Sequence, residues 1–272
     1  MSDRAQLLGR RSVTSERWRQ FMLTAGLRLL VGLVLVVAWE GVVLLNLSTP
    51  FWISQPRLLA MRLVEDLLSA DFWYHAGVTL YETVLGLASG AILGGISGYF
   101  LARHKLLDIA LEPYLAALYS LPRVALAPLF ILWFGIGLLS KVMLAVSIVY
   151  FIMHYSVYSG VKNVDPDLIN AVRTMGAKEG YLTRHIVLPS CVPFIFSGLR
   201  ISLGMALIGT VIGEMIASQK GMGRLIAIAS GNFDTTGLFS TFVMLAAMAM
   251  LLGALMKAVE TRLQRWQQEP SF

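Results

Sequence analysis

Three charged side chains lie in stretches of the sequence that are otherwise apolar. Arg123 falls inside the stretch 119–133, and Arg200 and Glu214 share the apolar run that ends near residue 217. A charge at membrane depth is costly to expose to lipid, so such residues usually face a protein interior or a water-filled cavity. Two arginines in that position would favour an anion. The alternative for Arg123 is that its long side chain only reaches toward the membrane surface or pairs with a carboxylate.

Prolines interrupt the stretch around Arg123. Pro113, Pro122 and Pro128 stand at spacings that break or kink a helix, because proline lacks the backbone N–H and its ring collides with the preceding turn. A broken helix that carries a charge at membrane depth is expected to line a cavity. We therefore assign a candidate pathway across the membrane to Pro122, Arg123, Pro128, Arg200 and Glu214. Glu40 and Glu82 are weaker candidates, since either could simply pair with a basic residue.

Residue types that would carry catalysis or bind metal are sparse and scattered. Cys191 is the only cysteine, and the four histidines do not cluster with it. The chain has no glycine-rich phosphate loop of the GxxxxGK type. We therefore expect no enzyme activity, no metal site and no cofactor. A membrane-embedded enzyme stays as an alternative, as does a secondary transporter, which would usually show internal repeats.

The composition is that of a membrane protein. Of 272 residues, 57% are hydrophobic and 14% are charged, and the mean hydropathy is +0.70. Apolar stretches near the ~20 residues that cross a bilayer recur along the chain. They are 29–47, 83–102, 114–139, 142–160, 191–217 and 238–256. The pattern predicts an all-α integral membrane protein with about six transmembrane helices, and it excludes a large soluble catalytic domain.

The basic residues lie where they orient a membrane protein. Six arginines precede the first apolar stretch, and Lys257, Arg262 and Arg265 follow the last one. The loops 103–110 and 161–190 are basic as well. Because cytoplasmic segments carry the excess of Lys and Arg, both termini should be cytoplasmic. The net charge of +6 is thereby explained without nucleic-acid binding.

Glycines recur along one face of the second apolar stretch. Gly86, Gly90, Gly94 and Gly98 follow one another at i, i+4 spacing. Small residues at this spacing let a neighbouring transmembrane helix approach closely. We interpret the stripe as a packing surface.

The longest predicted cytoplasmic loop contains a helix with clear start and stop signals. Asp165 suits the N-cap, Pro166 the first helical position and Gly176 a C-terminal turn of positive φ. A second short helix is expected from Lys178 to His185, followed by Leu188-Pro189. The pair should form a compact helix-turn-helix that acts as a docking element on the inner membrane face.

This loop resembles a motif of a known family. The run Asn170-Ala171-Val172-Arg173-Thr174-Met175-Gly176-Ala177, followed by Leu188-Pro189, is similar to the "EAA" motif of ATP-binding-cassette (ABC) importer permeases. Asn170 stands where the motif has its leading glutamate, and Val172 stands where it has its second alanine. The resemblance implies that this helix couples the chain to a separate ATPase, through Asp165, Pro166, Asn170, Ala171, Arg173, Gly176 and Ala177.

The resemblance extends over roughly residues 56–266. It includes 121–129, 131–137, 198–200, 211–214 and 221–223, and it is strongest to the branch that imports aliphatic sulfonates, taurine or nitrate. In the fourth stretch the sequence departs from that branch, with Tyr150-Phe151-Ile152 where Phe-Phe-Pro is common. The resemblance implies a type I (MetI-like) architecture and a multi-pass protein of the bacterial inner membrane. The chain would be the permease subunit for a small anionic nutrient.

Partners and segments follow from the same resemblance. It implies ABC ATPase subunits that use ATP and Mg, an external substrate-binding protein, and a permease homodimer or heterodimer surrounded by membrane lipid. We expect a basic cytoplasmic tail at 1–28, a first transmembrane anchor with an external loop at 29–55, and a second short tail at 267–272. The permease core would span 56–266, with the coupling loop at 161–190.

Overall fold

The computed structural model describes residues 2–263, with side chains from residue 22 onward. The expected tail at 267–272, and Arg265 before it, lie outside the described residues. The chain forms two compact units, 1–64 and 65–272, and each is described by itself.

The first unit holds the longest helix. Helix α1 (Ser2–Leu44) contains a membrane-length apolar segment, Met22–Leu44. Helix α2 (Pro50–Ile53) follows, and the Trp39 indole N–H donates to the Ile53 carbonyl at 3.1 Å. Helix α3 (Pro56–Leu68) begins in this unit and crosses the boundary between the two. The apolar side chains of α1 are largely exposed, as expected of a segment whose solvent is lipid.

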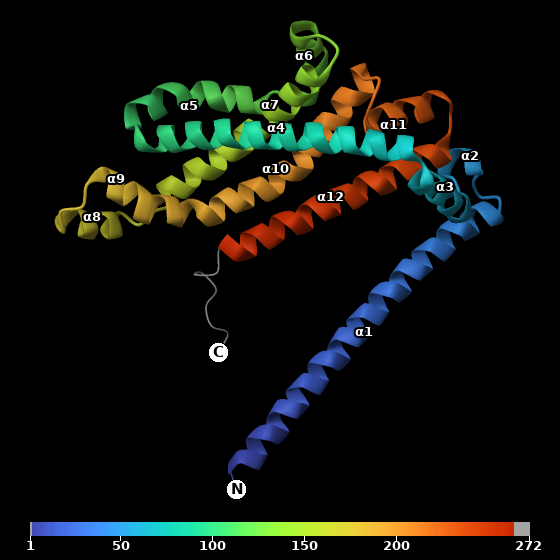
Figure 1. Cartoon of the computed structure of the whole chain (residues 1–272), viewed down its shortest axis with the longest axis horizontal. Coiled ribbons are helices and arrows are strands. Elements are labelled where there is room, and N and C mark those ends of the chain that lie inside the picture. The colour runs from blue at the N-terminus through green and yellow to red at the C-terminus, as the bar shows by residue number, and fades with distance from the viewer. Residues whose placement is uncertain (1, 264–272) are drawn as a thin grey trace. The chain divides into compact units, whose positions relative to one another are not determined.

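The second unit is built around three long helices that lie side by side in Figure 1. They are α4 (Ala70–Arg103), α7 (Leu138–Lys162) and α10 (Leu188–Ala217). The remaining elements are α5 (Lys105–Ser120), the 3₁₀ turn η1 (Arg123–Leu126), α6 (Ala127–Phe134), α8 (Pro166–Thr174), α9 (Glu179–Leu182), the π-helical turn η2 (Thr183–Val187), α11 (Met222–Gly231) and α12 (Thr235–Leu263).

The glycine stripe of α4 packs against α7, as the sequence predicts. A Cβ at Gly86 would collide with Ala145, and one at Gly90 with Val149. At Gly94 and Gly98 a Cβ would strike the backbone carbonyls of α7 itself. Glycine therefore sets the distance between the two helices, since any larger residue would push them apart.

The described residues contain five candidate membrane-spanning helices, or six if a strongly bent pair of helices counts as one span, in agreement with the predicted number of about six. Five helices are long and apolar enough to cross a bilayer: the segments Met22–Leu44, Ala70–Arg103, Leu138–Lys162, Glu179–Ala217 and Thr235–Leu263. The sixth segment joins Lys105–Ser120 to Arg123–Phe134 across a bend of 84°. The fold is all-α and integral to the membrane. The orientation of the termini stays a prediction.

The bend between α5 and α6 lies at Pro122, one of the three prolines expected to break or kink this segment. Pro113 is accommodated inside α5, whereas Leu121 is extended and Pro122 ends the helix. A residue before proline avoids the helical region, and proline supplies no N–H to continue the ladder. Pro128 occupies the first turn of α6, where a missing N–H costs nothing.

Candidate functional site

Helix α8 in the loop 161–190 has well-defined ends. The Asp165 carboxylate accepts from the backbone N–H of Asp167 at 2.8 Å, and Pro166 opens the helix. At the other end Gly176 has a φ of +89°. Its N–H donates to the Arg173 carbonyl at 3.0 Å, and the Ala177 N–H donates to the Val172 carbonyl at 3.3 Å. These two bonds form a Schellman cap, which confirms the predicted positive-φ turn.

The two faces of α8 have different surroundings. Ile169 and Val172 pack against the apolar core that α7 and α10 share, as does Ala177 after the turn. Leu168 is nevertheless 47% exposed, and Met175, just past the helix, is 84% exposed. Asn170, Ala171 and Arg173 are exposed as well. The helix is therefore anchored to the bundle by one face and presents a mixed apolar and polar face outward.

An ionic cluster ties this loop to the end of α4. The Glu179 carboxylate accepts from Arg173 at 2.6 Å and from Arg103, in the last turn of α4, at 2.5 Å. These three side chains connect the loop to a helix that is distant in sequence. A movement of α8 would therefore be transmitted to α4 as well as to α7 and α10, the helices that the loop connects.

The second helix of the loop differs from the prediction. It does not stop before Leu188-Pro189 but runs without interruption from α9 through η2 into α10. The Leu188 N–H donates to the Thr183 carbonyl, five residues back, so the turn is wider than an α-helical one. A widened turn gives the Pro189 ring room beside the preceding turn, which explains why this proline does not end the helix.

Arg123 lies at the bend after α5. Its guanidinium donates to the Tyr119 carbonyl at 2.9 Å and stacks on the rings of Tyr119 and Phe151, at 4.9 Å and 4.4 Å from their centroids. These contacts cap the carbonyl end of α5 and hold the cation beside aromatic faces. Next to it is a cavity of about 420 Å³ between α5, α7 and α10, lined by Tyr119, Tyr155, Ser156, Ser159, Phe194 and Ser197, together with Ile152, Ile201 and Met205.

The other two predicted pathway charges have partners of their own. Arg200 is exposed and donates to Glu260 of α12 at 2.5 Å. Glu214 is completely buried, where its carboxylate accepts from the Thr79 hydroxyl at 2.8 Å and from the Gly223 N–H at 2.7 Å. The structure does not gather these charges around Arg123. A role for Arg200 and Glu214 in a pathway stays a prediction.

Sequence reasoning missed the residues around Glu214 and Glu82. Thr79 also accepts from the Met222 N–H at 2.8 Å, so it joins α4 to both α10 and α11. Glu82 pairs with Lys141 of α7, which is the basic partner that the sequence left open. Lys141 falls just before the predicted stretch 142–160, and a lysine at the start of an apolar run is the signal that could have found it. Glu40 lies half-buried in α1.

The sequence matches a described family. Residues 90–268 match the family described as "Binding-protein-dependent transport system inner membrane component". A riboflavin transport system permease of Chloroflexus aurantiacus is 36% identical over 86% of this chain and 88% of its own length. A putative aliphatic sulfonates permease of Bacillus subtilis is 29% identical (88% and 86% covered), and a taurine permease of Escherichia coli is 28% identical (87% and 88% covered).

Solved structures agree on the fold. The MetNI methionine ABC transporter in an inward-facing conformation contains a chain that superposes with a TM-score of 0.61 at 18% identity, over 68% of this chain and 93% of that one. The similar proteins are transport permeases rather than enzymes. Membership of this transport family implies ATPase subunits and a substrate-binding protein as partners. The chain thus belongs to the family of binding-protein-dependent transport system inner membrane components, and it is a multi-pass permease subunit of an ABC importer.

Proposed function

We propose that this permease couples to its ATPase through α8 and carries a small anionic nutrient, such as a sulfonate, taurine or nitrate, across the membrane. The observation that carries the coupling proposal is the geometry of α8. Both helix ends are capped, one face packs on the core of α7 and α10, and Leu168 and the following Met175 remain exposed. Such a helix can transmit a push without bending, because its own backbone groups and inner face are satisfied.

The docking proposal can be tested by cross-linking, because Cys191 is buried and is the only cysteine of the sequence. On a Cys191→Ser background, Met175→Cys would place a single thiol on the outward side of the loop. We expect a bifunctional reagent to join this thiol to the ATPase subunit. The matched control is Gln219→Cys, an exposed position just beyond the other end of α10. Cross-links to the ATPase from position 219 and not from position 175 would contradict the proposal.

The proposed assembly pairs this chain with a second permease. Two copies, or one copy and a homologue, would enclose the pathway, with the external binding protein delivering the nutrient. ATP and Mg²⁺ would be bound by the ATPase, and the permease itself would bind no cofactor. Mass measurement of the intact complex purified through a tag on this chain would distinguish the homodimer from the heterodimer.

The proposed pathway runs past the bend at Pro122, Arg123 and Pro128. The Arg123 contacts described above are to a carbonyl and two aromatic rings, so its positive charge is available to an anion in the adjoining cavity. We expect Arg123→Ala to lower uptake while the complex still assembles, and Arg123→Lys to retain part of it. The same uptake assay with Arg200→Ala and Glu214→Gln decides whether those two residues belong to the pathway.

A second candidate substrate class is a planar heterocycle. The cavity beside Arg123 is lined by the rings of Tyr119, Tyr155 and Phe194 and by serine hydroxyls, a surface suited to stacking and hydrogen bonding. Relatives include a riboflavin permease and a formylaminopyrimidine permease. Identification of the ligand released from the co-purified binding protein by mass spectrometry would decide between the two classes. A sulfonate or nitrate supports the first class, and an aromatic ring compound supports the second.

A further inference from the structure

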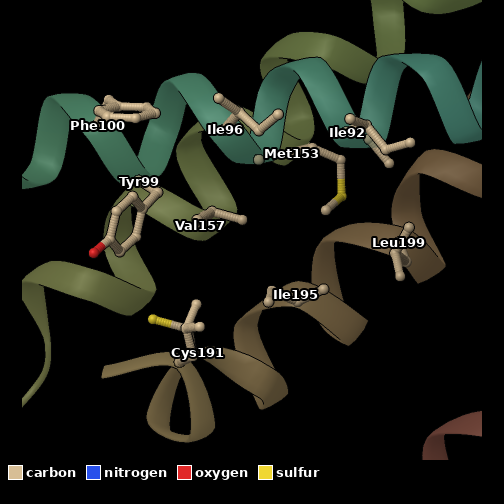
Figure 2. A pocket seen from close by; sticks show the side chains of 12 residues that line it. Ile92, Ile96, Tyr99, Phe100, Met153, Val157, Cys191, Ile195 and Leu199 are labelled. Atoms are coloured by element: carbon tan, nitrogen blue, oxygen red, sulfur yellow. The ribbon is translucent and has the colours of Figure 1, made fainter. Parts of the chain in front are cut away.

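An apolar groove opens between α4 and α10, with α7 as its floor. In Figure 2, Ile92, Ile96 and Phe100 follow one another along α4, while Cys191, Ile195 and Leu199 follow one another along α10. Met153 and Val157 of α7 lie between the two rows. The groove encloses about 480 Å³. It is separate from the cavity beside Arg123, with which it shares no lining residue.

The length and the position of the groove match one half of a bilayer. The wall on α4 runs from Ala91 to Phe100, a rise of nine steps or about 14 Å at 1.5 Å per residue. One leaflet contributes about 15 Å to the hydrocarbon core. Phe100 is three residues from the end of α4 at Arg103, and Leu188 opens α10, so the groove begins beside the loop 161–190 and ends near the middle of the membrane.

The end of the groove beside the loop carries polar and basic groups. The Tyr99 hydroxyl lies 3.1 Å from the Thr183 hydroxyl, and the ring of His104 stacks on that of Phe100 with centroids 6.4 Å apart. Arg184 is exposed one turn before Leu188, a lining residue, and Lys105 opens α5 next to His104. This end therefore combines an apolar entrance with cationic side chains, which is the surface an anionic lipid headgroup recognises.

We propose that the groove binds one acyl chain of an anionic phospholipid from the leaflet on the side of the loop 161–190, with its phosphate at Arg184. The apolar lining, the length of one leaflet and the cationic entrance all fit this occupant. The naming of this leaflet as the cytoplasmic one rests on the proposed function. The acyl chain fills the space between the lining side chains of α4 and α10.

Photolabelling tests the acyl-chain site directly. The complete complex would be placed in nanodiscs with phosphatidylglycerol that carries a diazirine on its acyl chain, and the labelled peptides would be mapped by mass spectrometry. We expect label on residues 92–100 and 191–199. Gly95→Leu should remove it, because a Cβ at Gly95 meets only Val157 at 3.7 Å and the larger side chain extends into the groove. Leu93→Phe, at an exposed position of α4 that does not line the groove, is the control.

A second arm tests the headgroup. Labelling by phosphatidylglycerol should exceed labelling by phosphatidylcholine about fivefold, the effect of one basic residue near an anionic headgroup. Arg184→Gln should abolish that preference, and Arg262→Gln, in the last turn of α12, should not. Equal labelling of Gly95→Leu and the unaltered protein would overturn the proposal, as would cross-links from the groove to another polypeptide helix. Equal labelling by the two lipids would overturn the role of Arg184. Neither arm measures ATP hydrolysis or uptake, so failure here is distinguishable from failure of the ATPase docking proposal.

Discussion

Lys141, in the first turn of α7, donates a hydrogen bond to Glu82 in the interior of α4, and the two residues are 5% and 2% exposed. The ion pair lines a cavity of about 400 Å³ with Ser218, Gln219 and Lys220, beyond the end of α10. Two opposite charges that are both out of water depend on each other, because either one alone would be an uncompensated buried charge.

The first prediction concerns this pair. Glu82→Met or Lys141→Met alone should destabilise the purified permease by about 3–5 kcal/mol, since each leaves a buried charge without its partner. The double variant, with both residues replaced by methionine, should recover most of that loss. Thermal unfolding followed by tryptophan fluorescence would measure the effect.

The exposed pair Arg200–Glu260 provides the control for this cycle. Arg200 has a side chain that is 64% exposed, so removal of its charge should change the unfolding temperature little. If the double methionine variant proved as unstable as the single ones, the loss of stability would not come from an unpaired buried charge.

The second prediction uses two adjacent glycines of α4. Gly94→Ala should destabilise the protein by about 1–3 kcal/mol, because the added Cβ would strike the Tyr150 carbonyl of α7, and backbone cannot move aside cheaply. Gly95→Ala should be neutral or stabilising by up to about 1 kcal/mol, since it meets only Val157 at 3.7 Å and alanine favours the helix. Thermal unfolding of both variants separates close helix packing from a general effect of alanine, and equal loss in the two would contradict the packing role.

The third prediction concerns the ionic cluster of the loop. Glu179→Gln should leave the complex assembled but reduce the uptake achieved per ATP hydrolysed, because the carboxylate joins Arg173 of α8 to Arg103 of α4. Arg103→Lys, which keeps the charge but not the fork geometry, should have a smaller effect than Arg103→Gln. Uptake and ATP hydrolysis would be measured together in proteoliposomes. An unchanged ratio of uptake to ATP hydrolysis in Glu179→Gln would show that the ionic cluster plays no part in coupling.

Local rules in the sequence account for much of the fold. The apolar stretches, the proline break, the glycine stripe and the capped helix ending at Gly176 each depend on residues close together in the chain, so the sequence predicts them. The apolar pattern predicts only the stretch 83–102, whereas α4 begins at Ala70, because His75 and Glu82 lower the apolar character of its first turns.

Contacts between distant residues could not be predicted in the same way. Thr79 and Glu214 are 135 positions apart, and Glu82 and Lys141 are 59 apart, so no spacing rule connects them. The continuity of α9 with α10 was missed for a local reason, because a π-helical turn accommodates a proline that normally marks a helix boundary. The sequence predicts that α8 forms an exposed docking element, but it does not predict by itself which partner contacts that element.

The most direct test of the coupling account is a comparison of Gly176→Ala with Gly176→Leu. Both variants incur similar backbone strain, roughly 1 kcal/mol or more, because the φ of +89° disfavours any residue with a Cβ. No atom of the described residues lies within 4 Å of a Cβ built at Gly176, beyond its chain neighbours. The size of the side chain therefore matters only if another protein contacts this turn.

ATPase pull-down and uptake would be measured for both variants in the same membranes. The account predicts that Gly176→Ala retains much of both activities, whereas Gly176→Leu yields a folded permease that has lost the ATPase or no longer transports. Full ATPase binding and full uptake by Gly176→Leu would contradict the docking role of this loop.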